Sequence, residues 1–151
     1  MIFRLATRQD LPAVLALLAD GAGDRTTGPV PVEAGAAHER AFAAIEADPR
    51  NELLVLQDGD ALIGCLQLTY IPGLGQGGRE RALVEAVRIR ADRRGGGLGA
   101  ELMGLAVERA RGRGCGLVQL TSDKRRTAAH RFYERLGFAR SHEGFKLRLE
   151  P

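Results

Sequence analysis

A glycine-rich turn in the middle of the chain has the residue types and the spacing of an anion-binding site. Its residues run Arg93-Arg94-Gly95-Gly96-Gly97-Leu98-Gly99-Ala100, between an alternating apolar pattern at 83–90 and a helical pattern at 98–113. Glycine has no Cβ, so the backbone can take a positive φ and a ligand can approach the amide groups closely. The helix begins inside the turn, which directs unpaired N–H groups and the positive end of the helix dipole toward an anion. Because Arg93 and Arg94 add positive charge, we interpret this glycine turn as a phosphate cradle, with a plain strand-to-helix turn as the alternative.

Three kinds of phosphate-binding loop share this chemistry, and the sequence distinguishes them. A nucleotide-hydrolase loop places Lys and then Ser or Thr after its last glycine, where this chain has Ala100, so that class is excluded. The dinucleotide pattern G-x-G-x-x-A fits, and Asp123 follows about twenty residues on, but too little chain remains for the further βα units of that fold. The third pattern, R-x-x-G-x-G, is met by Arg94, Gly97 and Gly99 and needs only the half-domain that is available.

The elements that must hold this turn in place can be read from the apolar periodicity on both sides of it. Strands are predicted at 2–6, 53–57, 61–70, 83–90, 117–121 and 145–149, and the Asp58-Gly59-Asp60 turn makes the second and third a hairpin. Helices are predicted at 11–18, 32–47, 98–113 and 127–136, with a glycine- and proline-rich loop at 21–31. This order predicts an α/β (α+β) fold in which helices cover the faces of a mixed sheet.

Length and composition indicate one globular domain over residues 1–151. The chain is 44% hydrophobic and 27% charged, and no stretch approaches the roughly twenty apolar residues of a membrane span. The run Met1-Ile2-Phe3-Arg4 has no signal-peptide pattern, so we expect a cytoplasmic protein with no membrane partner. Cys65 and Cys115 lie in apolar runs and are expected to be reduced core residues. No metal is expected, because metal-ligand spacing is lacking among the three histidines, His38, His130 and His142.

The charge of the chain does not by itself indicate a nucleic-acid partner. The formal net charge is +3, and the basic residues are almost all arginines spread along the chain. A nucleic-acid surface would cluster basic residues with aromatic ones, and only the stretch 124–135 approaches this. A small polyanion explains such a local concentration equally well, so nucleic acid is the less favoured partner.

A second motif lies near the end of the chain, in the run Ala129-His130-Arg131-Phe132-Tyr133-Glu134-Arg135-Leu136-Gly137-Phe138. Together with Arg94-x-x-Gly97-x-Gly99 and the order of elements, it resembles the GCN5-related N-acetyltransferases, the GNAT family, which transfer an acetyl group from acetyl-coenzyme A to an amine. The resemblance spans nearly the whole chain and is specific because both motifs occur at this spacing. It implies a splayed central sheet, in which the fourth and fifth strands part at their ends and the gap holds the pantetheine arm of acetyl-coenzyme A.

The resemblance also implies which residues bind acetyl-coenzyme A. The amide groups of the glycine turn would hold the pyrophosphate; they belong to Gly95, Gly96, Gly97, Leu98, Gly99 and Ala100. Backbone groups of Val87 and Ile89 would pair with the pantetheine arm like an added strand, beside the charge of Arg94. Many members have an Asn three residues before the position of Ala129, where this chain has Arg126, which could bind the cofactor phosphates instead.

An amine attacks only when neutral, so the reaction that the resemblance implies needs a base or a water relay. Glu85 is the leading candidate, because it interrupts the apolar face of a strand, where an unpartnered carboxylate is costly to bury. That face consists of Leu83, Val87 and Ile89. Partial desolvation would make Glu85 a stronger base. The alternative is a kink that turns Glu85 outward, or an ion pair with Arg79 or Arg81.

The departing thiolate is stabilised by a proton, and Tyr133 is the candidate donor because phenol and thiolate have similar basicity. The resemblance puts the general acid of the family at this tyrosine. The alternative is that Tyr133 only belongs to a core-facing cluster with Phe132, Leu136 and Phe138. A buried phenol needs a hydrogen-bond partner, and Phe132 already supplies packing, so the acid role is favoured.

The sequence does not define the amine acceptor. We expect a small molecule or a peptide that binds at the loops 21–31, 71–79 and 141–144. His142 and Glu143 are candidate contacts, and His130 is interpreted equally as a surface or a functional residue. The alternative function is a non-catalytic coenzyme A sensor or interaction module of the same fold. A homodimer is an expectation from the resemblance alone.

Overall fold

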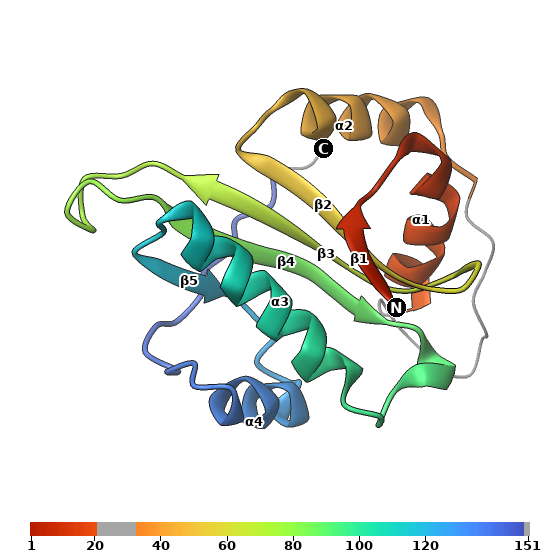
Figure 1. The fold of residues 1–151 in the computed structure, drawn as a ribbon. Helices are drawn as coiled ribbons and strands as arrows, with labels where there is room; N and C mark the ends of the chain where they lie inside the picture. Colours follow the sequence, from red (N-terminus) through yellow and green to blue (C-terminus); the bar gives the residue numbers. More distant parts are fainter. Residues whose placement is uncertain (21–32, 150–151) are drawn as a thin grey trace.

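The computed structural model describes residues 1–20 and 33–149 of the chain. Within them a five-stranded sheet has the order β1 (Ile2–Leu5), β2 (Asn51–Asp58), β3 (Ala61–Ile71), β4 (Arg81–Ile89) and β5 (Leu117–Leu120) (Figure 1). Neighbouring strands are antiparallel from β1 to β4, whereas β5 runs parallel to β4 after the crossover helix α3 (Leu98–Arg113). The predicted mixed sheet is confirmed.

Helices cover both faces of this sheet, as the sequence predicted. On one face α3 packs through Leu102, Met103 and Ala106, and Figure 1 shows this helix lying in front of the strands. The helix α4 (Thr127–Arg135) packs its aromatic residues against the same core. The helices α1 (Leu11–Asp20) and α2 (Ala36–Ala47) pack against the other face. Single-turn helices, η1 (Arg8–Asp10) and η2 (Ala91–Arg93), precede α1 and the glycine turn. The predicted loop 21–31 and the predicted helix start at 32 lie outside the described residues.

The central strands are apolar on both sides because each contributes to both cores. In β2, Leu54 and Leu56 face the α3 side, whereas Leu53 and Val55 face α1 and α2. A strand buried on both faces has a continuous apolar run instead of a strict alternation. This explains why the sequence predicts β2 and β3 correctly although apolar residues follow one another directly.

The sixth predicted strand, at 145–149, is wrong, since the structure contains no strand in residues 139–149. Phe145, Leu147 and Leu149 are 93%, 86% and 90% exposed, although they alternate with charged residues as in a half-buried strand. A strand forms only when a neighbour pairs with its backbone groups, and the two-residue period carries no information about that neighbour. This segment does not fill the free edge of β5, the last strand of the described sheet.

The predicted parting of the fourth and fifth strands is confirmed. β5 pairs with β4 only between residues 81–84 and 117–120, and β4 continues to Ile89 with no strand beside it on that side among the described residues. On the other side the register against β3 shifts, and Ala86 has a positive φ of 56°, which together mark a β-bulge. We call the place where β4 and β5 separate the fork; its arms are residues 85–89 and 121–123.

Candidate active site

The glycine turn leads into α3 without a capping side chain. Gly97 precedes the helix with a φ of 83° and Gly95 has a φ of 85°, a region that glycine enters without steric cost. The Glu101 amide donates to the Gly97 carbonyl at 3.1 Å, and the amide groups before it have no helical acceptor. The start of α3 therefore presents the free N–H groups that an anion site requires.

Two arginines connect the glycine turn to its neighbours. Arg93 forms an ion pair with Asp58 in the β2–β3 turn, with 2.9 Å between Nη2 and Oδ2. Arg94 donates from Nε to the carbonyl of Ile89 at 3.0 Å, which ties the turn to the unpaired end of β4. The glycine turn and the fork are thus neighbours, and Arg93 serves in part as a structural brace.

Gly99 is required for packing as well as for its amide group. A Cβ at this position would lie 3.3 Å from Cζ of Phe132 on α4, tighter than an ordinary van der Waals contact. The glycine of the first motif therefore makes room for the phenylalanine of the second motif. The sequence places these motifs far apart and contains no signal for this contact, which brings α4 against the start of α3.

Tyr133 lies on α4 and packs against the core beneath α3. Its ring lies edge-to-face against those of Phe132 and Phe138, with centroids 5.1 and 5.9 Å away. The aromatic cluster that we considered as the alternative is therefore present. Burial raises the pKa of Tyr133, and the positive charges of Arg126 and Arg88 partly oppose this rise. Among the described residues the hydroxyl group has no hydrogen-bond partner, so packing alone does not satisfy the phenol.

Glu85 does not interrupt the apolar face of β4, so the expected desolvation is wrong. The bulge at Ala86 inserts one extra residue into the strand, and this reverses the alternation of side chains after it. Glu85 lies opposite Gln67, on the sheet face that α1 and α2 cover, and is exposed. Two residues beyond the bulge pack instead into the core on the α3 side: Val87 and Ile89.

The kink that we considered as the alternative for Glu85 is present. Leu83 and Glu85 share one face of β4, because they lie opposite alternate residues of β3, before the bulge. In the described part of the chain neither Arg79 nor Arg81 forms an ion pair with Glu85. The carboxylate is therefore open to solvent on the face opposite the α3 core.

Three buried polar atoms without a hydrogen-bond partner lie at this site, two in the arms of the fork and one on α4. Among the described residues these atoms are Nε of Arg88, Oγ of Ser122 and Nδ1 of His130. Within residues 1–20 and 33–149 the Arg88 guanidinium bonds only to the neighbouring Val87 carbonyl, from Nη1 at 2.9 Å. Unsatisfied buried polar atoms are rare, and water or a bound molecule accounts for them at functional sites. The sequence did not single out Arg88 or Ser122, because a basic or polar residue at a strand end is common.

The remaining candidate residues lie on exposed segments. Arg126 is exposed and precedes α4, where its charge acts on Tyr133. Asp123, the residue that a dinucleotide site would use, is held by Arg125 at 2.9 Å, which lowers the pKa of its carboxyl group. His142 and Glu143 are exposed, and Nδ1 of His142 lies 2.6 Å from the hydroxyl of the preceding serine.

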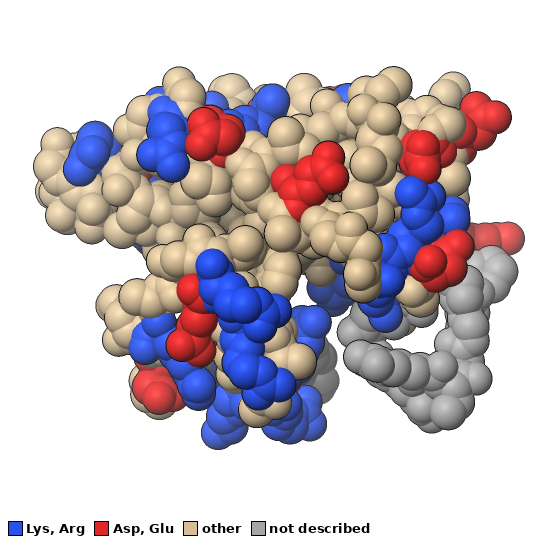
Figure 2. Space-filling view, turned by 60° about the horizontal axis from the view of Figure 1, so that its bottom comes forward, with Lys and Arg blue, Asp and Glu red and all other residues tan. Residues whose placement is uncertain are grey.

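Basic side chains gather near this site. Figure 2 shows Lys and Arg side chains over the part of the surface that α4 and the turn before it form. The basic residues exposed there are Lys124, Arg125, Arg126, Arg131 and Arg135. A positively charged surface raises the local concentration of a polyanionic ligand such as a nucleotide.

The described part of the chain has neither a metal-binding cluster nor a membrane-spanning helix. Residues 1–20 and 33–149 contain no group of three or more His, Cys, Asp or Glu side chains that could hold a metal ion. None of the helices in that part of the chain has the length and apolar character that crossing a bilayer requires.

Comparisons with known proteins agree with this geometry. A crystal structure of a transcriptional regulator from Bacillus halodurans C-125 is 43% identical, with a TM-score of 0.87, over 98% of this chain and 99% of that chain. A putative acetyltransferase from Agrobacterium tumefaciens is 29% identical, with a TM-score of 0.83 and the same coverage. An acetyltransferase from Trypanosoma brucei is 27% identical, with a TM-score of 0.77, again over 98% and 99% of the two chains. A comparison with curated proteins found no match.

The family profile described as "Acetyltransferase (GNAT) family" matches residues 21–138, which include the glycine turn, the fork and the whole second motif. Family and neighbours together support acetyl transfer in general. The chain belongs to the GNAT acetyltransferase family.

Proposed function

We propose that the protein transfers an acetyl group from acetyl-coenzyme A to a primary amine, with both substrates bound at the fork. The observation that carries this proposal is the unpaired edge of β4 from residue 85 to residue 89, next to an uncapped helix start. Arg94 joins this edge to the glycine turn through Ile89, and the contact of Gly99 with Phe132 joins the turn to α4. An exposed backbone edge, an anion site and a phenol therefore belong to one continuous surface.

The residues present fit acetyl-coenzyme A, which supplies an acetyl group activated as a thioester. The amides of residues 95–100 would hold its diphosphate, because the helix start is free of capping side chains. The backbone of Val87 and Ile89 would pair with its amide-containing arm, as an added strand pairs with a sheet edge. Arg94 and Arg126 would supply charge for the phosphates.

Glu85 takes the proton of the amine in this proposal, directly or through water. Its exposure supports a water relay, because water can reach the carboxylate. Glu85 lies before the bulge, and the bulge brings Val87 and Ile89 to the opposite face, where they join the core. An amine that arrives from the α1 and α2 side would meet the carboxylate.

Tyr133 donates a proton to the departing thiolate in this proposal. Burial raises its pKa, so the phenol is protonated at neutral pH and holds a proton to give. Its hydroxyl is not used by any described residue, and the charges of Arg88 and Arg126 lie close enough to act on it. These features support an acid at this position.

Release of free thiol from acetyl-coenzyme A in the presence of an amine panel tests the proposal. The panel covers amino acids, polyamines, aminoglycosides and peptide N-termini, and we expect thiol release above the amine-free rate with at least one class. Glu85→Gln should lower kcat about 100-fold or more, the low end of general-base contributions. Glu108→Gln, at an exposed carboxylate that pairs with Arg111 on α3, is the control and should retain parent activity. Equal rates for the two variants would remove the base assignment.

A second function is supported by one comparison, since the Bacillus halodurans protein is called a transcriptional regulator. This chain would then bind coenzyme A without transferring its acetyl group and pass the signal to a partner. Calorimetric binding of coenzyme A with no thiol release from any amine would favour this role. Binding to duplex DNA that weakens steeply with salt would favour a nucleic-acid partner.

A further inference from the structure

Arg88 carries a positive charge that no described residue neutralises. Its guanidinium donates from Nη1 to the Val87 carbonyl at 2.9 Å, and its buried Nε has no acceptor among the described residues. No carboxylate of residues 1–20 and 33–149 forms an ion pair with it. Burying a charged donor without an acceptor costs free energy. A bound anion would remove that cost, so Arg88 marks a place for one.

The unused part of this guanidinium is the edge that binds carboxylates elsewhere in the molecule. Nε–H and Nη2–H point to the same side of the planar group and match the two oxygens of a carboxylate. Other arginines of the described chain bind an acidic side chain through these two nitrogens, namely Arg8, Arg90, Arg109 and Arg125. In Arg88 the Val87 carbonyl takes Nη1, and this edge has no acceptor among the described residues.

The register of the sheet places Arg88 beside Glu85. Arg88 lies opposite Cys65 on β3, and Glu85 lies opposite Gln67, two residues away. The bulge at Ala86 adds one residue between them, so both side chains leave the same face of β4, about 6.5 Å apart along the strand. That face is the one that α1 and α2 cover. A carboxylate for an amine and a guanidinium for an acid therefore lie side by side.

The charge of Arg88 also reaches the proposed acid. Burial raises the pKa of Tyr133, and Arg126 and Arg88 are positive charges close enough to oppose this rise. Burial likewise raises the pKa of Cys65, and Arg88 opposes that rise too. The guanidinium thus acts on Cys65 in the α1 and α2 core and on Tyr133 at the α3 core. It belongs to the fork, the place of the proposed reaction.

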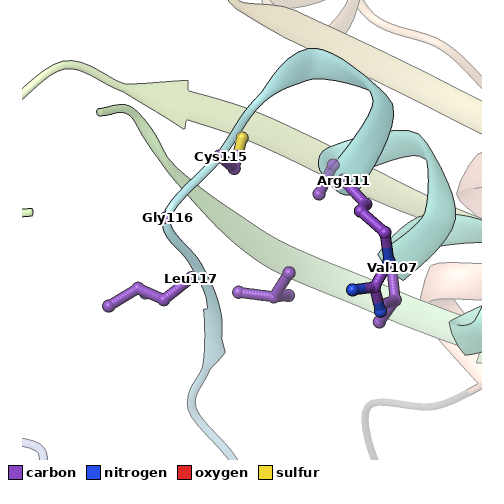
Figure 3. Close-up of a pocket in the computed structure, with 7 residues that line it drawn as sticks. Val107, Arg111, Cys115, Gly116 and Leu117 are labelled. Carbon is purple, nitrogen blue, oxygen red and sulfur yellow. The ribbon is translucent and has the colours of Figure 1, made fainter.

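The slot between α3 and β5 is a poorer place for an amine. Its volume is about 220 Å³, and Figure 3 shows Cys115 and Leu117 on the chain that enters β5, with Val107 and Arg111 on α3. Of the described residues, no Asp or Glu lines it, so an ammonium group finds no counter-charge there. The slot also lies at the start of β5, which pairs with the start of β4, whereas Arg88 is near the end of β4.

We propose that the acceptor is a small amino acid whose carboxylate binds the Nε and Nη2 edge of Arg88 while its amine faces Glu85. This inference rests on the proposed acetyl transfer and names its substrate class. Two hydrogen bonds of about 2.8 Å with one or two carbon atoms between amine and carboxylate span a gap of this size. Diamines and amino-acid amides lack the anion and would leave the charge of Arg88 unpaired.

Matched pairs of amino acids and their amides test this inference on the full chain. Thiol release from acetyl-coenzyme A is measured with each amino acid, with its amide and with diamines. The parent kcat/KM should be at least about 10-fold higher for the acid, the low end of what a hydrogen bond to a charged group contributes. Arg88→Gln should lose this preference because only the rate with the acid falls. A parent preference for amides or diamines, or an equal loss with acid and amide in Arg88→Gln, would overturn the inference.

Arg81→Gln is the matched control, because it removes the same charge from the same strand. Arg81 lies opposite Ile71, whereas Arg88 lies opposite Cys65, so the two positions are about 20 Å apart along β3. Arg81→Gln should keep the parent preference for the acid. Loss of the preference in both variants would show an effect of overall charge and would also overturn the inference.

Binding measurements separate this inference from the proposed transfer. With coenzyme A present, the acid should raise the Tm of the parent protein, the amide should not, and the acid should not raise the Tm of Arg88→Gln. Acid-specific binding that depends on Arg88, without thiol release from any amine, would support the carboxylate site and remove the proposed transfer. Thiol release from amides and diamines as readily as from amino acids would support the transfer and overturn the carboxylate site. Absence of both acid binding and acid preference would overturn it as well.

Discussion

The two tyrosines of this chain allow catalysis and stability to be separated by the same chemical change. Tyr70 and Tyr133 are the only tyrosines, and Tyr→Phe removes one hydroxyl oxygen from each. Tyr133 has no hydrogen-bond partner for that oxygen among the described residues, whereas the Tyr70 hydroxyl donates a short hydrogen bond to Glu52. The structure therefore predicts opposite outcomes for the two variants.

The expected magnitudes follow from those contacts. A hydrogen bond to a charged group contributes about 1.5–3 kcal/mol. Glu52 keeps its ion pair with Arg109 in Tyr70→Phe, and Arg113 remains 4.0 Å above the ring, so the loss belongs at the low end, about 1.5 kcal/mol. For a domain of this size that lowers Tm by about 3–6 °C. Tyr133→Phe should change the free energy of unfolding by less than about 0.5 kcal/mol, because no contact is lost.

The effects on activity should be the reverse, with a large loss for Tyr133→Phe and almost none for Tyr70→Phe. Removing a general acid costs about 10²–10⁴-fold in rate, so Tyr133→Phe should lower kcat by that range and leave coenzyme A affinity unchanged. Tyr70 is 2% exposed in the core, and Tyr70→Phe should retain kcat within about twofold at a temperature where it is folded. The assays are thermal unfolding, thiol release and calorimetry. Full turnover by Tyr133→Phe, or a Tm loss equal to that of Tyr70→Phe, would refute this reasoning.

Three further predictions concern the glycine turn, the loss of stability at acid pH and the packing of the core. Gly97→Ala should destabilise the protein by about 1–2 kcal/mol, because Gly97 has a positive φ, and it should weaken coenzyme A binding. Gly104→Ala, in the interior of α3 with open space around it, should stabilise the protein by about 0.5–1 kcal/mol. Urea unfolding measures both changes in stability. The hydrogen bond from Arg4 lowers the pKa of Asp10, so the stabilisation of the folded protein by the Asp10 carboxylate is present above about pH 4 and is lost as pH falls through the lowered pKa. The urea midpoint should therefore fall less steeply between pH 6 and pH 3 in Asp10→Asn than in the parent protein. Leu102→Ala should cost about 2–5 kcal/mol, because Leu102 on α3 is 0% exposed in the core. A loss below about 1 kcal/mol in denaturant unfolding would contradict that packing.

The sequence predicts the elements that depend on local pattern. The helix at 98–113 is predicted with the bounds that α3 has, because glycines mark both ends and apolar residues recur at helical spacing. The hairpin of β2 and β3 follows from the Asp-Gly turn. Both features are encoded within about twenty residues, where periodicity and turn chemistry act directly.

The sequence does not predict features that depend on a distant partner. The segment 145–149 has the pattern of a strand, but a strand also needs a neighbouring edge, which no local pattern supplies. The contact of Gly99 with Phe132 and the bond from Arg94 to Ile89 join elements whose arrangement only the folded chain defines. The glycine turn at the start of α3 could be predicted, whereas its attachment to the fork could not.

The bulge at Ala86 is the least predictable feature and the one on which the proposed site depends most. Alanine rarely takes a positive φ, so nothing at this position signals a bulge, and the strain costs about 1–2 kcal/mol. The Cys65 thiol donates a hydrogen bond to the Ala86 carbonyl at 3.6 Å. Burial raises the pKa of Cys65 to about 12, although the charge of Arg88 opposes this rise, so the thiol keeps its proton at neutral pH. Glu85 lies on the α1 and α2 face before the bulge, and the one extra residue places Val87 in the core on the α3 side. A regular strand would put both side chains on the α1 and α2 face, so the bulge is what separates the proposed base from Val87 in the core.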